Sequence, residues 1–131
     1  MTYDPNWLSR IVEKDPRFKP VAYEFLFDSL EFTRNRLAKE RGSKVKHVSG
    51  PELLEGVRLL ALESFGRLAL TVLNQWGIYS TSDIGDMVFN VIESGEMEQT
   101  DEDSRADFDK VYDFDEAFNR EYKIEIDELG S

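Results

Sequence analysis

Apolar side chains recur every three to four residues along most of the chain, which is the spacing of amphipathic helices. Several of these stripes are preceded by a capping residue or a proline, and several are followed by glycine, as helix starts and ends favour. The acidic stretch after Thr100 is expected to hold one more short helix. The pattern therefore predicts five helices, over residues 5–14, 20–41, 52–76 and 81–93 and after Thr100.

The segment 52–76 is the most apolar in the chain, and its stripe is wide enough to be covered on more than one side. We therefore expect it to be the central helix. A straight helix of this length would run for about 37 Å, across a whole domain of this size. For that reason the sequence predicts a bend or break near Gly66. Ahead of this helix, Ser49 and Glu52 have the spacing of a capping box.

Two short stretches have weak strand character. Residues 44–48 (KVKHV) are a candidate strand, and apolar and charged residues alternate over 122–126. The second stretch could pair with the first or form a tail. The sequence thus predicts one mainly α domain over residues 1–119, a compact bundle of about five helices with at most a small β element, for which a winged-helix-like form is one option. An acidic C-terminal strand or tail, 120–131, would follow it.

Charge is spread unevenly. The 131 residues carry a formal net charge of −11, and residues 96–131, with 14 acidic and four basic side chains, account for −10 of it. Residues 34–46, in contrast, hold six basic side chains and one acidic one. Opposite charges attract over about 8 Å at physiological salt. The acidic end could therefore pack near the basic segment, remain solvated, or leave either patch available to a charged partner.

Two segments are candidate interfaces. The basic one could meet an acidic protein surface or RNA phosphates, with Phe32 available to stack on a base. The acidic–aromatic one could dock into a partner's groove, or its rings could pack on the protein's own helices, which is the favoured alternative. The basic candidates are Arg34, Arg36, Lys39, Arg41, Lys44, Lys46 and His47, and the acidic–aromatic candidates are Phe108, Asp109, Tyr112, Asp113, Phe114, Asp115 and Phe118.

The composition lacks the residue types that most catalytic and metal-binding sites use. The chain has no cysteine and one histidine, which excludes disulfides, thiolate metal sites and cysteine nucleophiles. His47 and Ser49 could meet as base and nucleophile, but Ser49 is already expected to cap a helix. The acidic run that starts at Asp101 has Arg105 and Ala106 where an EF-hand needs an oxygen ligand and a glycine. We therefore predict no catalytic, cofactor-binding or metal-binding residue and no enzymatic activity.

The sequence also argues against sequence-specific DNA binding and against a membrane-spanning segment. No apolar run approaches the roughly 18 residues that span a membrane, and the N-terminus lacks a signal-peptide pattern. The turn before residue 81 and the helix after it could form a helix–turn–helix, but residues 81–93 contain three acids, no base, and only Asn90 as a reader of bases. We expect a cytoplasmic protein without sequence-specific DNA binding.

A family resemblance covers about residues 15–119. It is carried by four blocks: DPRFKPVAYEFLFDSLEFT, HVSGPELLEGVRLLALESFG, VLNQWGIYSTSDIGDMVFNVIESG and DSRADFDKVYDFDEAF. In these blocks the chain resembles a family of small conserved bacterial proteins described from planctomycetes and verrucomicrobia. The family is uncharacterised. The resemblance therefore implies a shared fold and a cytoplasmic bacterial setting, and it brings no activity, cofactor or catalytic residue.

The function favoured by the sequence is that of a non-enzymatic, cytoplasmic protein–protein interaction module with a polarised surface. The alternative is binding of RNA or a ribonucleoprotein through residues 34–47.

Overall fold

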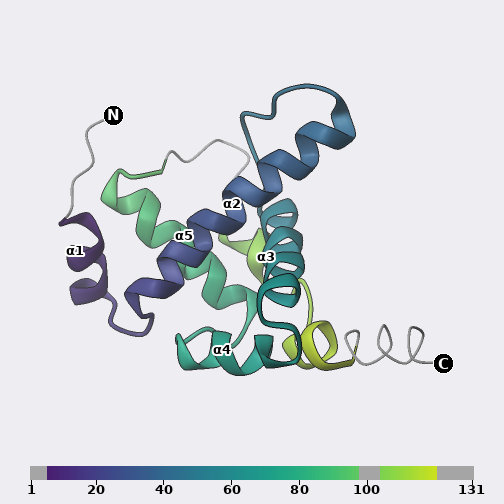
Figure 1. The fold of residues 1–131 in the computed structure, drawn as a ribbon. Coiled ribbons are helices and arrows are strands. Elements are labelled where there is room, and N and C mark those ends of the chain that lie inside the picture. Colours follow the sequence, from purple (N-terminus) through teal and green to yellow (C-terminus); the bar gives the residue numbers. More distant parts are fainter. Residues whose placement is uncertain (1–5, 98–103, 121–131) are drawn as a thin grey trace.

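The computed structural model describes residues 6–97 and 104–120, with side chains described as far as Phe118 (Figure 1). These residues form a mainly α-helical bundle without a strand, which confirms the predicted fold class. The elements in chain order are α1 (Trp7–Lys14), α2 (Pro20–Arg41), α3 (Gly50–Phe65), the 3₁₀ turn η1 (Gly66–Leu68), α4 (Ala69–Gln75), α5 (Thr81–Ser94), the 3₁₀ turn η2 (Arg105–Phe108) and the π-helical turn η3 (Glu116–Arg120).

Helix α3 is the central helix, as the sequence predicts. It packs against α2, α4 and α5 and against the short turns η2 and η3. Its start is fixed by the predicted capping box: the Glu52 amide donates to Ser49 Oγ at 3.2 Å, and the Ser49 amide donates to the Glu52 carboxylate at 2.9 Å. Four of its apolar side chains are buried: Leu53, Leu54, Val57 and Ala61.

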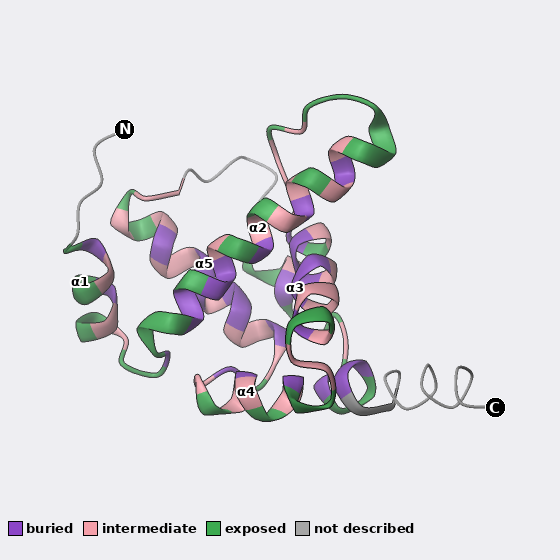
Figure 2. Ribbon diagram, viewed as in Figure 1, coloured by how far each residue is buried: buried purple, intermediate pink, exposed green. Residues whose placement is uncertain are grey.

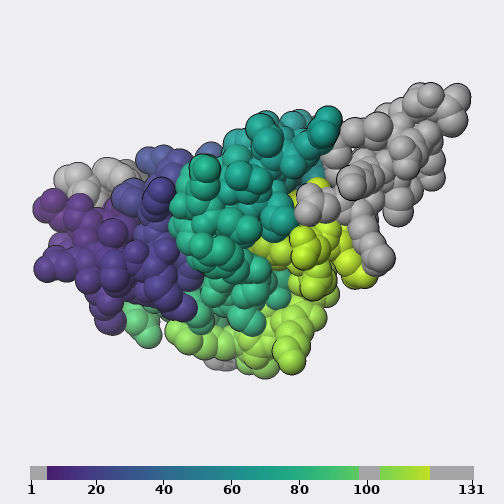
Figure 3. All heavy atoms as spheres, turned by 90° about the horizontal axis from the view of Figure 1, so that it is seen from below, coloured from purple at the N-terminus to yellow at the C-terminus, as the bar shows by residue number. Residues whose placement is uncertain are grey.

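The predicted break at Gly66 is confirmed. Gly66 has a φ of 53°, and the chain passes through η1 before it resumes as α4. The turn brings the end of α4 back toward α2, so that the Trp76 ring lies 5.4 Å from that of Phe25 and 5.6 Å from that of Phe65. Seen from below, the surface of α4 and the end of α3 lies between the N-terminal helices and the segment after residue 103 (Figure 3).

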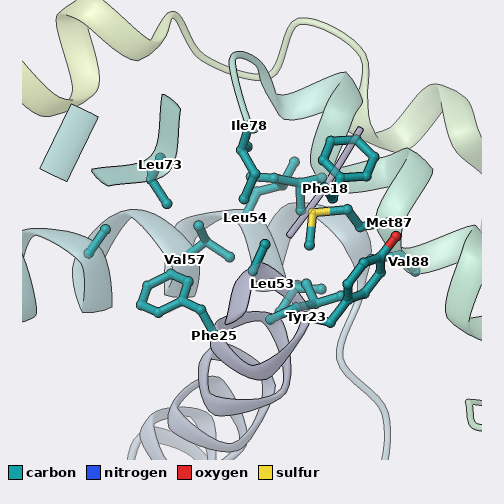
Figure 4. Packing of buried hydrophobic residues seen from close by; sticks show 14 of the residues in the cluster. Phe18, Tyr23, Phe25, Leu53, Leu54, Val57, Leu73, Ile78, Met87 and Val88 are labelled. Carbon is teal, nitrogen blue, oxygen red and sulfur yellow. The ribbon is translucent and has the colours of Figure 1, made fainter. Parts of the chain in front are cut away.

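The core is formed where α2, α3, α4 and α5 face one another (Figures 2 and 4). Side chains from these helices and from the loops between them are almost fully buried, and together they give the bundle its hydrophobic stabilisation. The largest apolar side chains that are fully buried are Phe18, Tyr23, Leu54, Leu73, Ile84, Met87, Val91 and Phe118.

Two local predictions were wrong. Residues 44–48 form an irregular loop, because no strand lies in the described ranges to pair with them. The residues described after Thr100 form the short 3₁₀ turn η2 rather than an α-helix, because Ser104 caps a turn at Ala106 and Asp107.

Several predictions fall outside the described residues. The Asp4-Pro5 start signal, Thr100 itself and the alternating stretch 122–126 belong to this group. So does the acidic end of the chain, whose packing on the basic segment stays a prediction. The division between a domain over 1–119 and a tail over 120–131 also stays a prediction.

Candidate docking surfaces

The basic segment lies at an exposed end of the molecule. The C-terminal end of α2 and the loop that follows it project beyond the body of the bundle, and most of this projection is exposed (Figures 1 and 2). Gly42 ends α2 in the left-handed conformation, with a φ of 69°, and turns the chain back toward α3. We call residues 36–46 the cationic projection, because they carry five basic side chains and one acidic one.

The basic side chains of this region differ in their surroundings. Lys39, Lys44 and Lys46 are exposed. Arg41 forms an ion pair with Glu52, the residue that closes the α3 capping box, and Arg36 lies 3.7 Å from Glu40 on the same helix. The cationic surface that a partner meets is therefore made mainly by the three lysines.

Arg34 and His47 belong to a different environment. Both are half-buried, and with Lys46 they line a hollow of about 590 Å³ between α2, the start of α3 and α5. The rest of its lining is largely apolar, and Glu96 adds a negative charge beside the cations. Arg34 Nε is buried there without a hydrogen-bond partner among the described residues. Arg34 and His47 are therefore less available to a partner than the three exposed lysines.

The acidic–aromatic segment folds back on the protein itself. Phe108, Phe114 and Phe118 are buried, and the Tyr112 hydroxyl donates to the Leu54 carbonyl at 2.8 Å. Burial raises the pKa of Tyr112, so that its hydroxyl stays protonated and keeps donating. The favoured alternative, packing on the protein's own helices, is the arrangement in the structure.

The acidic residues of that segment have local roles. Asp109 accepts from the Ser82 hydroxyl at 2.9 Å, which ties the segment to α5, and Asp113 accepts from the Glu116 amide at 3.2 Å. Asp115 is exposed. The segment therefore supplies core contacts and a tether, and its rings are not a ready anchor for a partner.

Asn90, the one residue of α5 suited to read bases, is engaged inside the protein. Its side-chain amide donates to Asp15 at 2.9 Å and to the Tyr23 hydroxyl at 3.1 Å. Arg17 also donates to Asp15, at 2.8 and 2.9 Å, and reaches Asp86 on α5 at 3.2 Å. This network holds the turn between α1 and α2 against α5.

The Asp15 network predicts a pH-dependent stability. Hydrogen bonds from Arg17, with a further one from Asn90, hold the pKa of Asp15 well below its usual range. A carboxyl whose pKa is lower in the folded state contributes stability above its unfolded pKa and loses that contribution as the pH falls. Asp15→Asn should therefore cost about 1–2 kcal/mol at pH 7, and the difference from the parent should shrink below about pH 5. Urea unfolding at pH 7, 5 and 3 measures this, and a constant difference would count against it.

His47 and Ser49, the pair considered for catalysis, both line the hollow between α2, α3 and α5, and the start of the acidic run, 101–103, lies outside the described residues. Ser49 is held in the capping box described above. In residues 6–97 and 104–120, no group of three or more histidine, aspartate or glutamate side chains is placed to hold a metal ion.

None of the helices described is both long enough and apolar enough to cross a membrane.

One surface was missed by sequence reasoning. A hollow of about 610 Å³ lies between α2, the end of α3 and the end of α4, with Phe25, Phe65 and Trp76 in its lining and three acidic residues of α2 beside them. In the sequence, Phe25 and Phe32 lie on the flanks of the apolar stripe of α2, and this is the only signal of an apolar surface there. The sequence does not show that α4 turns back at Gly66 and makes this flank of α2 one wall of a groove.

Comparison with protein-family models, with curated proteins and with solved structures finds no match for this chain. The resemblance to the bacterial family therefore stays a prediction.

Proposed function

We propose that this protein is a non-enzymatic interaction module that binds an acidic segment of a partner protein through the cationic projection. The observation that carries the proposal is the position of Lys39, Lys44 and Lys46, which are exposed on a part of the chain that extends beyond the bundle. A cationic surface on a projecting element attracts an acidic partner and speeds their encounter. The cytoplasmic location expected from the sequence belongs to the same proposal.

RNA binding by the same projection is the second candidate, favoured by the same three lysines. For this function the sequence predicts that Phe32 stacks on a base, and its position in the structure does not favour that role. Phe32 lines the groove beside the acidic residues of α2, and its ring is thus placed among negative charges rather than among the lysines. Single-stranded RNA is held by stacking together with phosphate contacts, so a protein partner fits the surface better.

A charge-reversal pair tests the proposal. Lys39→Glu with Lys44→Glu removes two exposed cations without touching Arg41, whose ion pair supports the α3 cap. Binding of an acidic peptide should weaken by about tenfold or more, because close charge pairs across an interface are strongly coupled. The control is Lys19→Glu with Arg67→Glu, which changes the net charge equally at exposed positions outside the projection. Fluorescence anisotropy with a labelled peptide measures both.

The same titrations decide between the two candidates. Peptide binding that is lost in the projection variant and kept in the control supports the proposed function. Equal losses in the two variants would contradict it, since only overall charge would then matter. If RNA binds more tightly than the peptide, with a steep dependence on salt, the result would support RNA binding as the function in place of protein binding.

A further inference from the structure

We infer that the groove between α2, α3 and α4 is a second docking surface, and that it takes a basic amphipathic helix from a partner protein. The inference does not depend on the cationic projection, because the two surfaces lie on different parts of α2 and have opposite charge.

The floor of the groove is aromatic. Phe25, Phe65 and Trp76 form a triangle of ring contacts with centroids 5.4 to 5.7 Å apart, and Leu60 and Phe32 extend the lining. Phe25 is buried and lies at the edge of the core cluster in Figure 4, whereas Phe65 and Trp76 are only half-buried. The floor is thus anchored in the core and still offers apolar surface to a ligand. Aromatic rings in such a setting are typical of sites that carry binding energy.

The rim of the groove is acidic. Glu24, Asp28 and Glu31 occur at i, i+4 and i+7 on α2, a spacing that places them along one face of the helix. All three are exposed, and none forms an ion pair with a side chain in the described part of the chain. None of the described residues that line the hollow is basic. Three carboxylates beside an apolar floor favour a ligand that presents lysine or arginine next to apolar side chains.

The dimensions suit a helix. The α2 residues that line the groove run from Val21 to Phe32, about 16 Å or three helical turns. A helix laid along such a groove contacts it through side chains at i, i+3, i+4 and i+7. The volume of about 610 Å³ leaves room for several apolar side chains of that helix.

Charge complementarity argues for a different protein as the occupant. The stretches of this chain outside the described residues are net negative in side-chain charge: one acid in 1–5, four acids in 98–103, and four acids against one base in 121–131. The acidic rim repels all three. The cationic projection of a second copy has the right charge but lacks apolar anchors, since its Leu37 is buried in its own bundle.

The test uses Trp76 as the reporter. The chain has two tryptophans, and Trp7→Phe leaves Trp76, in the groove, as the only one. The probe is a synthetic helical peptide of about five turns with leucine at i, i+3, i+4 and i+7 and lysine on both flanks. It should change the Trp76 emission at saturable concentrations, whereas a peptide of the same composition in scrambled order should not. A peptide with glutamate in place of lysine should not bind.

A matched pair of variants locates the site. Glu24→Lys should lower the affinity for the probe peptide by about fivefold, because an attractive charge on the rim becomes repulsive. Glu13→Lys makes the same change at an exposed position on α1 and should leave the affinity unaltered. Lys39→Glu with Lys44→Glu should not weaken the probe either, which separates this site from the cationic projection.

Four results would overturn the inference: equal losses for Glu24→Lys and Glu13→Lys, equal binding of the scrambled peptide, binding of the glutamate peptide, or concentration-dependent dimerisation that buries Trp76.

Discussion

Gly77→Ala should destabilise the protein by about 3 kcal/mol or more. Gly77 has a φ of +96°, which disfavours any side chain, and a Cβ built on it would lie 2.0 Å from the Arg17 carbonyl oxygen. That oxygen belongs to the backbone of the turn between α1 and α2, so no rotation of a side chain relieves the contact. The neighbouring bond from the Lys19 amide to the Trp76 carbonyl, at 3.1 Å, would be displaced as well.

Gly95→Ala is the matched control. Gly95 has a φ of +86°, close to that of Gly77, but a Cβ there would meet nothing within 4 Å. It should therefore show the cost of the backbone conformation alone, about 1–2 kcal/mol. Urea unfolding of the parent and the two variants measures the difference. Equal losses would show that the close approach of the two loops contributes nothing.

Gly56→Ala should lower the free energy of unfolding by about 2–3 kcal/mol, despite the better helix propensity of alanine. Gly56 is where α3 crosses α2, and a Cβ there would lie 1.7 Å from Thr33 Oγ1 and 3.1 Å from Thr33 Cβ. Thr33 is buried, and its hydroxyl donates to the Ser29 carbonyl at 2.6 Å. The two helices would have to move apart, which loosens the core between them.

A double-mutant cycle tests the cause of that loss. Thr33→Ala removes the hydroxyl that the new Cβ would strike, so it should restore at least about 1 kcal/mol in the Gly56→Ala background. In the parent background the same change should destabilise, because it leaves a small cavity. Ser64→Ala, at an exposed position of α3, serves as the control and should change stability by no more than about 0.5 kcal/mol. Simple additivity of the two changes would contradict a direct contact.

Local sequence signals predicted the elements well where a single residue determines the backbone. Ser49 with Glu52 marks the start of α3 and Gly42 marks the end of α2, because a capping hydroxyl or a left-handed glycine acts within one turn of itself. Gly66 was predictable for a different reason. The stripe of residues 52–76 was too long for a domain of this size, and glycine was the residue able to break it.

Features that depend on distant segments were not predictable in the same way. The spacing of Glu24, Asp28 and Glu31 is visible in the sequence, but an acidic face is usually just a solvated face. This face becomes the rim of a groove only because α4 turns back and places Trp76 beside α2. The close approach of Gly77 to Arg17 likewise joins residues 60 positions apart, which no local pattern records.

The candidate interfaces show the same division. The cationic projection was predictable because its charge is contiguous in sequence and its position at a helix end exposes it. The acidic–aromatic segment has an equally distinctive sequence, but Phe108, Phe114 and Phe118 are buried. Whether an aromatic side chain binds a partner or the protein's own core depends on tertiary packing, here on the surface that α3 and α5 leave uncovered.

The most direct test of the docking role is amide chemical-shift mapping of the protein with an acidic peptide. The proposal predicts saturable shifts concentrated in residues 36–46, weakened by added salt and absent from the Lys39→Glu, Lys44→Glu variant. Shifts scattered over the whole bundle, or none at millimolar peptide, would contradict a docking surface at this end of α2.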